Sequence, residues 1–240
     1  MKKPGPGAIF PTETNRLHNK HLVRIAWIAA CLTAGCGHKP APKAVAPVVP
    51  PTNPLPTTGL SGQQVVTLPL TLIAAEDSLH WTFPDRRSTL VRADSVVGEL
   101  LRARAPEVSW VPASEVRRAA RRAPGIATDP DQLGTAVLRV ESLTTIPDPL
   151  RGQVRTLAAL SGGGGGRYVF IPVALIFRLP PATPGVPRPA GVHTGMAELV
   201  LVMADIRTGL IQWRSMATGE GDDPWTALTR AVKKLTPGLP

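Results

Sequence analysis

The chain has 240 residues, of which 27 are Pro, 22 are Gly and only 4% are aromatic, so it encodes one or two domains joined to much irregular chain. Its formal net charge is +10, which in a cytoplasmic protein would point first to nucleic-acid binding. Both cysteines, Cys31 and Cys36, lie near the N-terminus, so the rest of the chain has no thiol for a disulfide or a thiolate metal site.

The N-terminal region is typical of an export signal. Lys20 and Arg24 precede an apolar run over residues 25–31, and small residues follow it. A basic segment, a short apolar segment and small residues before a cleavage point form a secretory signal. The run is far shorter than the ~20 apolar residues that a membrane-spanning helix needs. Residues 1–35 are therefore predicted to be a signal peptide, with the true translation start expected near residues 22–23.

The signal ends in Leu32-Thr33-Ala34-Gly35-Cys36, which resembles the lipobox of bacterial lipoproteins. The resemblance implies that Cys36 becomes the first residue and carries diacylglycerol on sulfur and an acyl chain on nitrogen. Because Gly37 follows and not Asp, it also implies an outer-membrane anchor that faces the periplasm. An ordinary signal peptide, cleaved after small residues with Cys36 incidental, is the alternative.

Export changes the meaning of the positive charge. Residues 1–35 hold five of the 27 Lys and Arg and one of the 17 Asp and Glu, which leaves 22 basic and 16 acidic residues and a net charge of +6. An exported basic protein meets anionic lipid head groups or cell-wall polymers before nucleic acid. We therefore expect an anionic lipid or cell-wall polymer, or an envelope protein, as partner, and no nucleic acid.

Residues 36–62 are predicted to be the lipidated cysteine and a Pro-rich linker. Seven prolines fall between residues 39 and 59, which favours disorder with extended polyproline-II segments at ~3.1 Å per residue. The linker would hold the following domain away from the membrane.

From residue 63 the pattern alternates between strands and helices. Residues 65–73 are β-branched and apolar, which predicts a first strand with a bulge or edge at Pro69. Asp94 is expected to cap a helix with an apolar stripe, a second strand to cover residues 108–112, and a helix to run from Ser114 to Arg122.

The middle of the chain is less regular. Residues 137–140 are compatible with a strand, and Asp148-Pro149 favours a helix over residues 149–160 with Leu150, Val154, Leu157 and Leu160 on one face. A run of five glycines, Gly162 to Gly166, then separates this helix from a long strand over residues 168–177.

The C-terminal part predicts a hairpin and a helix. Residues 198–205 form an apolar strand, Gly209 allows a turn, and residues 210–215 return with alternating polarity. Asp223-Pro224 then provides a cap and a first helical residue. The pattern predicts an α/β fold over residues 63–236, a single mixed-sheet sandwich with helices packed on the sheet.

The hairpin also carries a family resemblance. Arg167-Tyr168-Val169 before a strand, and Asp205, Thr208, Gly209 and Trp213 across the hairpin, are similar to the periplasmic lipoprotein domains of the TolB N-terminal, CsgG and LpoB type. The resemblance implies a non-enzymatic role through assembly with other envelope proteins.

Two basic features are candidate binding elements. Arg117, Arg118, Arg121 and Arg122 gather positive charge on one side of a helix, either as a patch for an anionic partner or as a solvated face. The glycine run followed by Arg167 could cradle an anion, but it lacks the Gly-Lys-Ser/Thr ending of a phosphate loop and precedes a strand. A flexible connection is the favoured interpretation of that run.

No motif predicts catalysis, a metal or a cofactor. His80 with Asp77 or Asp85 lacks ligand spacing, and Ser161, His193 and Asp205 have no Gly-x-Ser-x-Gly elbow. The sequence predicts a lipid-anchored, non-catalytic scaffold or regulator of envelope assembly that acts through protein–protein contacts. The alternatives are a CsgG-like secretion-pore subunit and a cell-wall ligand-binding protein or hydrolase.

Overall fold

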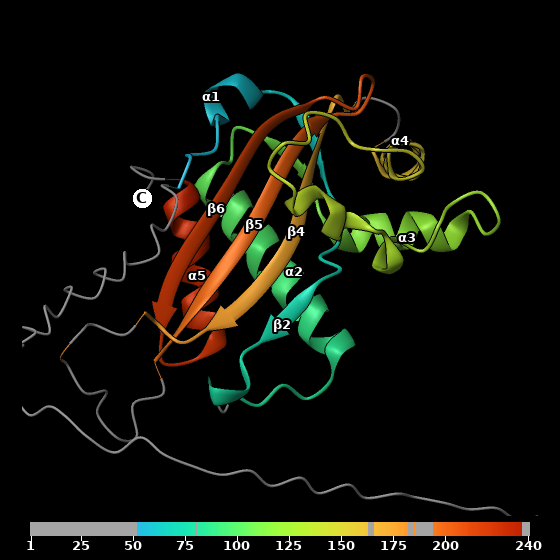
Figure 1. The fold of residues 1–240 in the computed structure, drawn as a ribbon. Coiled ribbons are helices and arrows are strands. Elements are labelled where there is room, and N and C mark those ends of the chain that lie inside the picture. Colours follow the sequence, from blue (N-terminus) through green and yellow to red (C-terminus); the bar gives the residue numbers. More distant parts are fainter. Residues whose placement is uncertain (1–51, 80, 163–165, 182–184, 186–193, 237–240) are drawn as a thin grey trace, which may run out of the picture. The chain divides into compact units, whose positions relative to one another are not determined.

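One mixed sheet forms the centre of the folded unit (Figure 1). The computed structural model describes residues 52–79, 81–162, 166–181, 185 and 194–236, all within the unit Val48–Pro240. The predicted signal peptide, residues 1–35, and Cys36 lie outside the described residues. None of the helices within the described ranges combines the length and the apolar character needed to cross a membrane.

The sheet combines an antiparallel meander with parallel strands. The meander consists of β4 (Tyr168–Arg178), β5 (Gly195–Asp205) and β6 (Ile211–Gly221). Parallel to β4 run β1 (Gln64–Thr67) and β2 (Ile73–Ala75), and β3 (Ser109–Val111) lies parallel to β1 on its other side. The main strand order is β3-β1-β4-β5-β6, with β2 also on β4. The predicted mixed-sheet α/β fold is therefore confirmed.

Two long helices cover one face of the sheet. In Figure 1, α2 (Arg86–Arg104) and α5 (Pro224–Leu235) run behind the strands. Between them and the sheet lies an aromatic row in which the Phe170 ring stands 5.7 Å from Trp110 and 6.3 Å from Trp213. Trp110 and Trp213 are buried and belong to the core.

The last helix forms as its sequence predicts. Asp223 Oδ1 accepts hydrogen bonds from Trp225 N at 2.9 Å and Thr226 N at 3.0 Å, and Pro224 occupies the first turn. α5 packs closely on β6, because a Cβ on Gly219 would lie 2.3 Å from the backbone of the helix. This glycine therefore sets the distance between helix and sheet.

Two further helices and two short 3-10 turns cover the other face. They are α3 (Ala113–Arg122), α4 (Leu150–Ser161) and the 3-10 turns η2 (Pro130–Gln132) and η3 (Thr135–Arg139). The predicted helices over 114–122 and 149–160 are confirmed to within a residue. Leu150, Val154 and Leu157 are buried as expected, whereas Leu160 is 37% exposed, so its predicted place on the apolar face is wrong.

The predicted single strand over residues 65–73 is in fact two strands. The chain leaves the sheet after Thr67 and rejoins it at Ile73. Pro69 has no N–H for a sheet ladder, and the next N–H, that of Leu70, donates to Asp94 Oδ1 at 2.8 Å. A side chain on α2 therefore replaces the strand partner that the backbone loses here.

Asp94 does not cap a helix, which corrects a second prediction. α2 begins at Arg86 and its cap is Asp85, whose Oδ1 accepts from Ser88 N at 2.8 Å. Asp94 lies in the middle of the helix and is buried. Aspartate is a common cap residue, and the sequence does not show that Asp94 instead accepts a hydrogen bond from the chain near Pro69.

The predicted strand at residues 137–140 is also wrong, because η3 occupies Thr135–Arg139. Leu138 is fully buried while Val137 and Val140 are exposed. One buried anchor in an irregular segment needs no sheet partner, and apolar residue types alone do not distinguish it from a strand.

The folded unit begins earlier than residue 63. Residues 52–54 lie against β6: Asn53 N donates to Ser215 Oγ at 2.9 Å, and Trp213 Nε1 donates to the Pro54 carbonyl at 2.9 Å. Leu55 and Leu60, the latter in α1 (Thr57–Leu60), are buried in the core. The predicted linker over 36–62 therefore extends too far, and its last residues from 52 belong to the domain.

Candidate functional site

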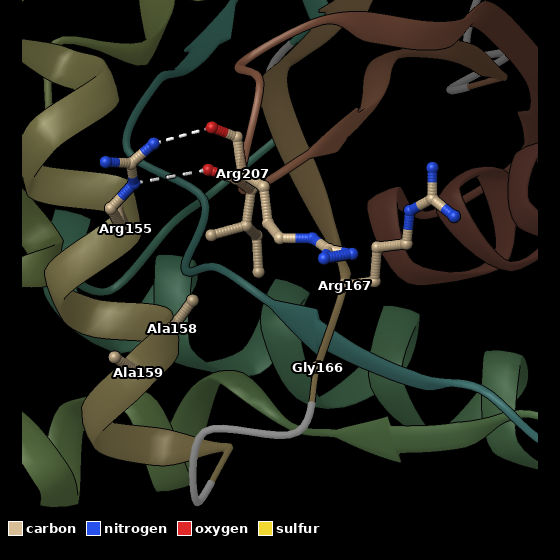
Figure 2. A pocket seen from close by; sticks show the side chains of 7 residues that line it. Arg155, Ala158, Ala159, Gly166, Arg167 and Arg207 are labelled. Atoms are coloured by element: carbon tan, nitrogen blue, oxygen red, sulfur yellow. Dashed lines mark hydrogen bonds between the residues drawn. The ribbon is translucent and has the colours of Figure 1, made fainter.

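A pocket of about 540 Å³ opens where three elements meet (Figure 2). α4 forms one wall, the segment before β4 a second, and the turn between β5 and β6 a third. The segment and the turn are joined by Ile206 N, which donates to the Arg167 carbonyl at 2.9 Å. The lining residues are Arg155, Ala158, Ala159, Gly166, Arg167, Ile206 and Arg207.

Asp205 organises the turn that forms the third wall. Its Oδ1 accepts from Arg207 N at 2.8 Å and Thr208 N at 3.2 Å, and Gly209 closes the turn at a φ of 76°. Burial acts to raise the pKa of Asp205, but the hydrogen bond from Arg167 and those from the turn hold it below its usual value. Asp205 therefore stays ionised.

Arg167 is held by that carboxylate. Its Nε lies 2.8 Å from Asp205 Oδ2, and its guanidinium stands 5.2 Å from the ring centre of Tyr168. The hydrogen bond to Asp205 raises the pKa of Arg167. Its side chain is still 52% exposed, so the guanidinium is oriented but accessible.

Arg155 is held from α4 by two carbonyls of the turn. Its Nη2 donates to the Arg207 carbonyl at 2.6 Å and its Nε to the Ile206 carbonyl at 3.5 Å (Figure 2). These acceptors are uncharged groups, so neither of them forms an ion pair with Arg155. Every charged side chain that lines the pocket is an arginine.

A second polar cluster is buried between α2, α3 and η2. Arg117 Nη2 lies 2.5 Å from Asp94 Oδ2, and its Nε lies 2.7 Å from Asp131 Oδ1. Burial raises the pKa of Asp94 to about 6, against the attraction of Arg117 and the hydrogen bond from Leu70. This cluster ties helices together and has little contact with solvent.

The predicted arginine patch on α3 divides into two parts. Arg117 points inward to its two carboxylates, so it does not belong to a surface patch. Arg118, Arg121 and Arg122 are exposed, and Arg118 Nη1 pairs with Glu115 at 2.7 Å. Arg121 also borders a hollow that Asp129 and Asp131 line together with Arg87 and Arg117, so acidic and basic side chains are mixed beside this helix.

The predicted catalytic and metal sites are only partly within the described residues. His80 and His193 lie outside them. The Ser161 hydroxyl donates to the Leu157 carbonyl of its own helix at 2.5 Å, and Asp205 is engaged by Arg167. Within the ranges that the structure describes, no three His, Cys, Asp or Glu side chains are grouped to hold a metal ion.

Sequence reasoning singled out Arg167 and Asp205 but missed Arg155 and Arg207 as partners in one site. The antiparallel register pairs Tyr168 with Asp205, so a predicted β4–β5 hairpin already implies that Arg167 and the turn after β5 are neighbours. The position of α4 depends on tertiary packing, and no local signal brings Arg155 to this turn.

No family model matches the chain, and no curated protein matches it significantly. Lipoprotein GNA1162 from Neisseria meningitidis is similar at 12% identity and a TM-score of 0.35, over 66% of this chain and 83% of that one. The LpoB C-terminal domain from Salmonella enterica is similar at 14% identity and a TM-score of 0.33, over 66% and 82%. LpoB from E. coli is similar at 15% identity and a TM-score of 0.29, over 92% and 96%.

These matches include the LpoB type that the sequence resemblance names. With TM-scores below 0.5 they carry no argument about function, which depends on the residues of this chain.

Proposed function

We propose that this protein is anchored to the outer membrane through a lipid on Cys36 and acts, without catalysis, as a scaffold or regulator that binds another component of the cell envelope. The observation that carries the proposal is the signal-like segment that ends in Ala34-Gly35-Cys36, followed by a Pro-rich sequence up to the folded unit. Several acyl chains give stable anchoring, whereas one chain alone is marginal.

The start of the folded unit supports this arrangement. Fifteen residues lie between Cys36 and Thr52, and a Pro-rich sequence of that length favours a reach of roughly 50 Å. At the domain, Asn53 and Pro54 are fixed to β6. An anchored domain with a pocket at its surface would meet partners at a distance from the bilayer.

The test of the anchor compares wild type with Cys36→Ala. We expect a triacylated N-terminal Cys36 by mass spectrometry and recovery in the membrane fraction, and for Cys36→Ala an unlipidated precursor. Wild type cleaved to a protein without lipid would overturn the anchor.

The test of the binding role uses photo-crosslinkers in living cells. One is placed at Arg139, beside the hollow that Glu198 and Arg214 border on the sheet, and a matched one at Ser95 on the exposed side of α2. A discrete envelope protein captured from one position and not from the other supports a scaffold. Equal, diffuse capture from both positions contradicts it.

A further inference from the structure

The charged side chains that line the pocket of Figure 2 are all positive. Three arginines line it (Figure 2). The carboxylate of Asp205, which pairs with Arg167, is not among the lining residues, and its side chain is only 3% exposed. That carboxylate offsets one of the three positive charges, so the pocket and its support carry a net charge of +2. Asp205 is engaged by Arg167 and the turn and does not enter the pocket.

The arginines are arranged to receive a ligand. Arg155 and Arg167 are each fixed from behind, by carbonyls and by a carboxylate respectively, which leaves donor nitrogens for a ligand. Among the described residues, no hydrogen-bond or ion-pair partner is found for the Arg207 guanidinium. Like charges held at one site repel each other, and an anion removes that repulsion.

The shape of the pocket complements its charge. Ala158, Ala159 and Gly166 contribute little side-chain bulk, so the hollow of about 540 Å³ stays open between the arginines. The three arginines that line it come from three different elements: α4, the segment before β4 and the turn after β5 (Figure 2). A tetrahedral group accepts hydrogen bonds in several directions, whereas a carboxylate accepts within one plane.

We propose that this pocket binds a phosphate monoester group. Such a group carries a charge of about −1.5 to −2 at pH 7, which is close in magnitude to the net charge of +2 at the pocket. The planar guanidinium of arginine also matches the spacing of phosphate oxygens. The proposal deepens the proposed function, since it names the chemistry of the component that the anchored domain recognises. The exposed arginines of α3 fit this role less well, because Glu115, Asp129 and Asp131 accompany them.

The experiment measures the binding of inorganic phosphate to the purified full-length protein by calorimetry. We expect saturable binding that Arg207→Gln and Arg155→Gln each weaken about tenfold or more, because each removes a charge-assisted contact. Arg121→Gln removes the same charge from α3 and should leave the affinity unchanged. Equal weakening by Arg121→Gln, or no weakening by the pocket variants, would overturn the proposal.

Succinate tests the chemistry of the anion. As a dianion with planar carboxylates it should bind at least several-fold more weakly than phosphate. Succinate binding as tight as phosphate binding would overturn the assignment to a phosphate group. Thermal unfolding is the control for folding. If each variant unfolds at the same temperature as wild type, a lost affinity comes from the pocket and not from misfolding.

Vesicles identify the source of the phosphate. Both vesicle proteins carry Cys36→Ala, so that no acyl chain binds the bilayer. If the group belongs to a lipid, phosphatidic acid vesicles bind the Cys36→Ala protein more strongly than the same protein with Arg207→Gln, and inorganic phosphate competes. If vesicle binding is independent of Arg207 while phosphate binding depends on it, the ligand is a soluble phosphate ester. Neither readout requires Cys36, so a failed anchor and a failed pocket are distinguished.

Discussion

The buried cluster of Arg117 with Asp94 and Asp131 shows how a few side chains hold irregular chain in place. Asp94 accepts from Leu70 N and from Arg117, so it connects the segment after β1 with α2 and α3. Removing one member of a buried ion pair leaves an unpaired charge, which commonly costs about 3–5 kcal/mol. The cluster thus holds the segment between β1 and β2, where the chain leaves the sheet.

Asp94 gives the stability of the domain a distinct pH dependence. Its pKa is raised to about 6 from an ordinary value of 3.8, so the folded state holds the proton more tightly than the unfolded chain. The free energy of unfolding should therefore rise as the pH falls from 7 through 6 towards 4.5. The full shift corresponds to roughly 3 kcal/mol.

Urea unfolding at pH 7, 6 and 4.5 measures this effect, with Asp94→Asn as the comparison. Asn keeps an acceptor for Leu70 N and does not titrate, so its stability should stay flatter over this range. The pH range of this effect is separate from that of Asp205. Because the pKa of Asp205 is lowered, its contribution to the free energy of unfolding is lost only at lower pH. Parallel curves for wild type and Asp94→Asn would contradict the assignment.

At the scale of elements, the contact between β6 and α5 depends on a residue without a side chain. An added Cβ at Gly219 would lie 2.3 Å from Ala227 O and Ala231 N, and backbone atoms cannot move aside as side chains do. We expect Gly219→Ala to lower the free energy of unfolding by roughly 1–3 kcal/mol, measured by urea unfolding.

Gly98 is the matched control for Gly219. It lies inside α2, and a Cβ there meets no atom within 4 Å. Gly98→Ala should raise the free energy of unfolding by about 0.5–1 kcal/mol, because alanine loses less backbone entropy in a helix. A Gly219→Ala protein as stable as wild type would show that α5 adjusts its distance to the sheet.

Elements with local signals were predictable and those that depend on distant partners were not. The Asp223-Pro224 start of α5 and the turn at Gly209 are encoded by neighbouring residues, and the structure has both. The break at Pro69 and the inward turn of Arg117 depend on contacts with Asp94 from another element. In the pocket, the predicted hairpin places Arg167 and Asp205 close together, whereas the position of Arg155 depends on how α4 packs on the sheet.

At the scale of the molecule, residues 52–62, which the sequence assigns to a linker, belong to the core. Leu60 is 2% exposed, and Leu60→Ala should lower the free energy of unfolding by about 2–5 kcal/mol, as for other buried leucines. Thr58→Ala, at an exposed position of the same short helix, is the control and should change little. Thermal and urea unfolding measure both; equal stability of Leu60→Ala and wild type would return residues 52–62 to the linker.

The attachment of residues 52–54 to β6 has a consequence for aggregation. β6 is the outermost strand of its side of the sheet, and an uncovered outer strand recruits strands of other molecules. Thr52, Asn53 and Pro54 bond along it from Met216 to Trp213. We therefore expect a protease that cuts after Leu55 to uncover β6, so that the cleaved domains associate along this strand.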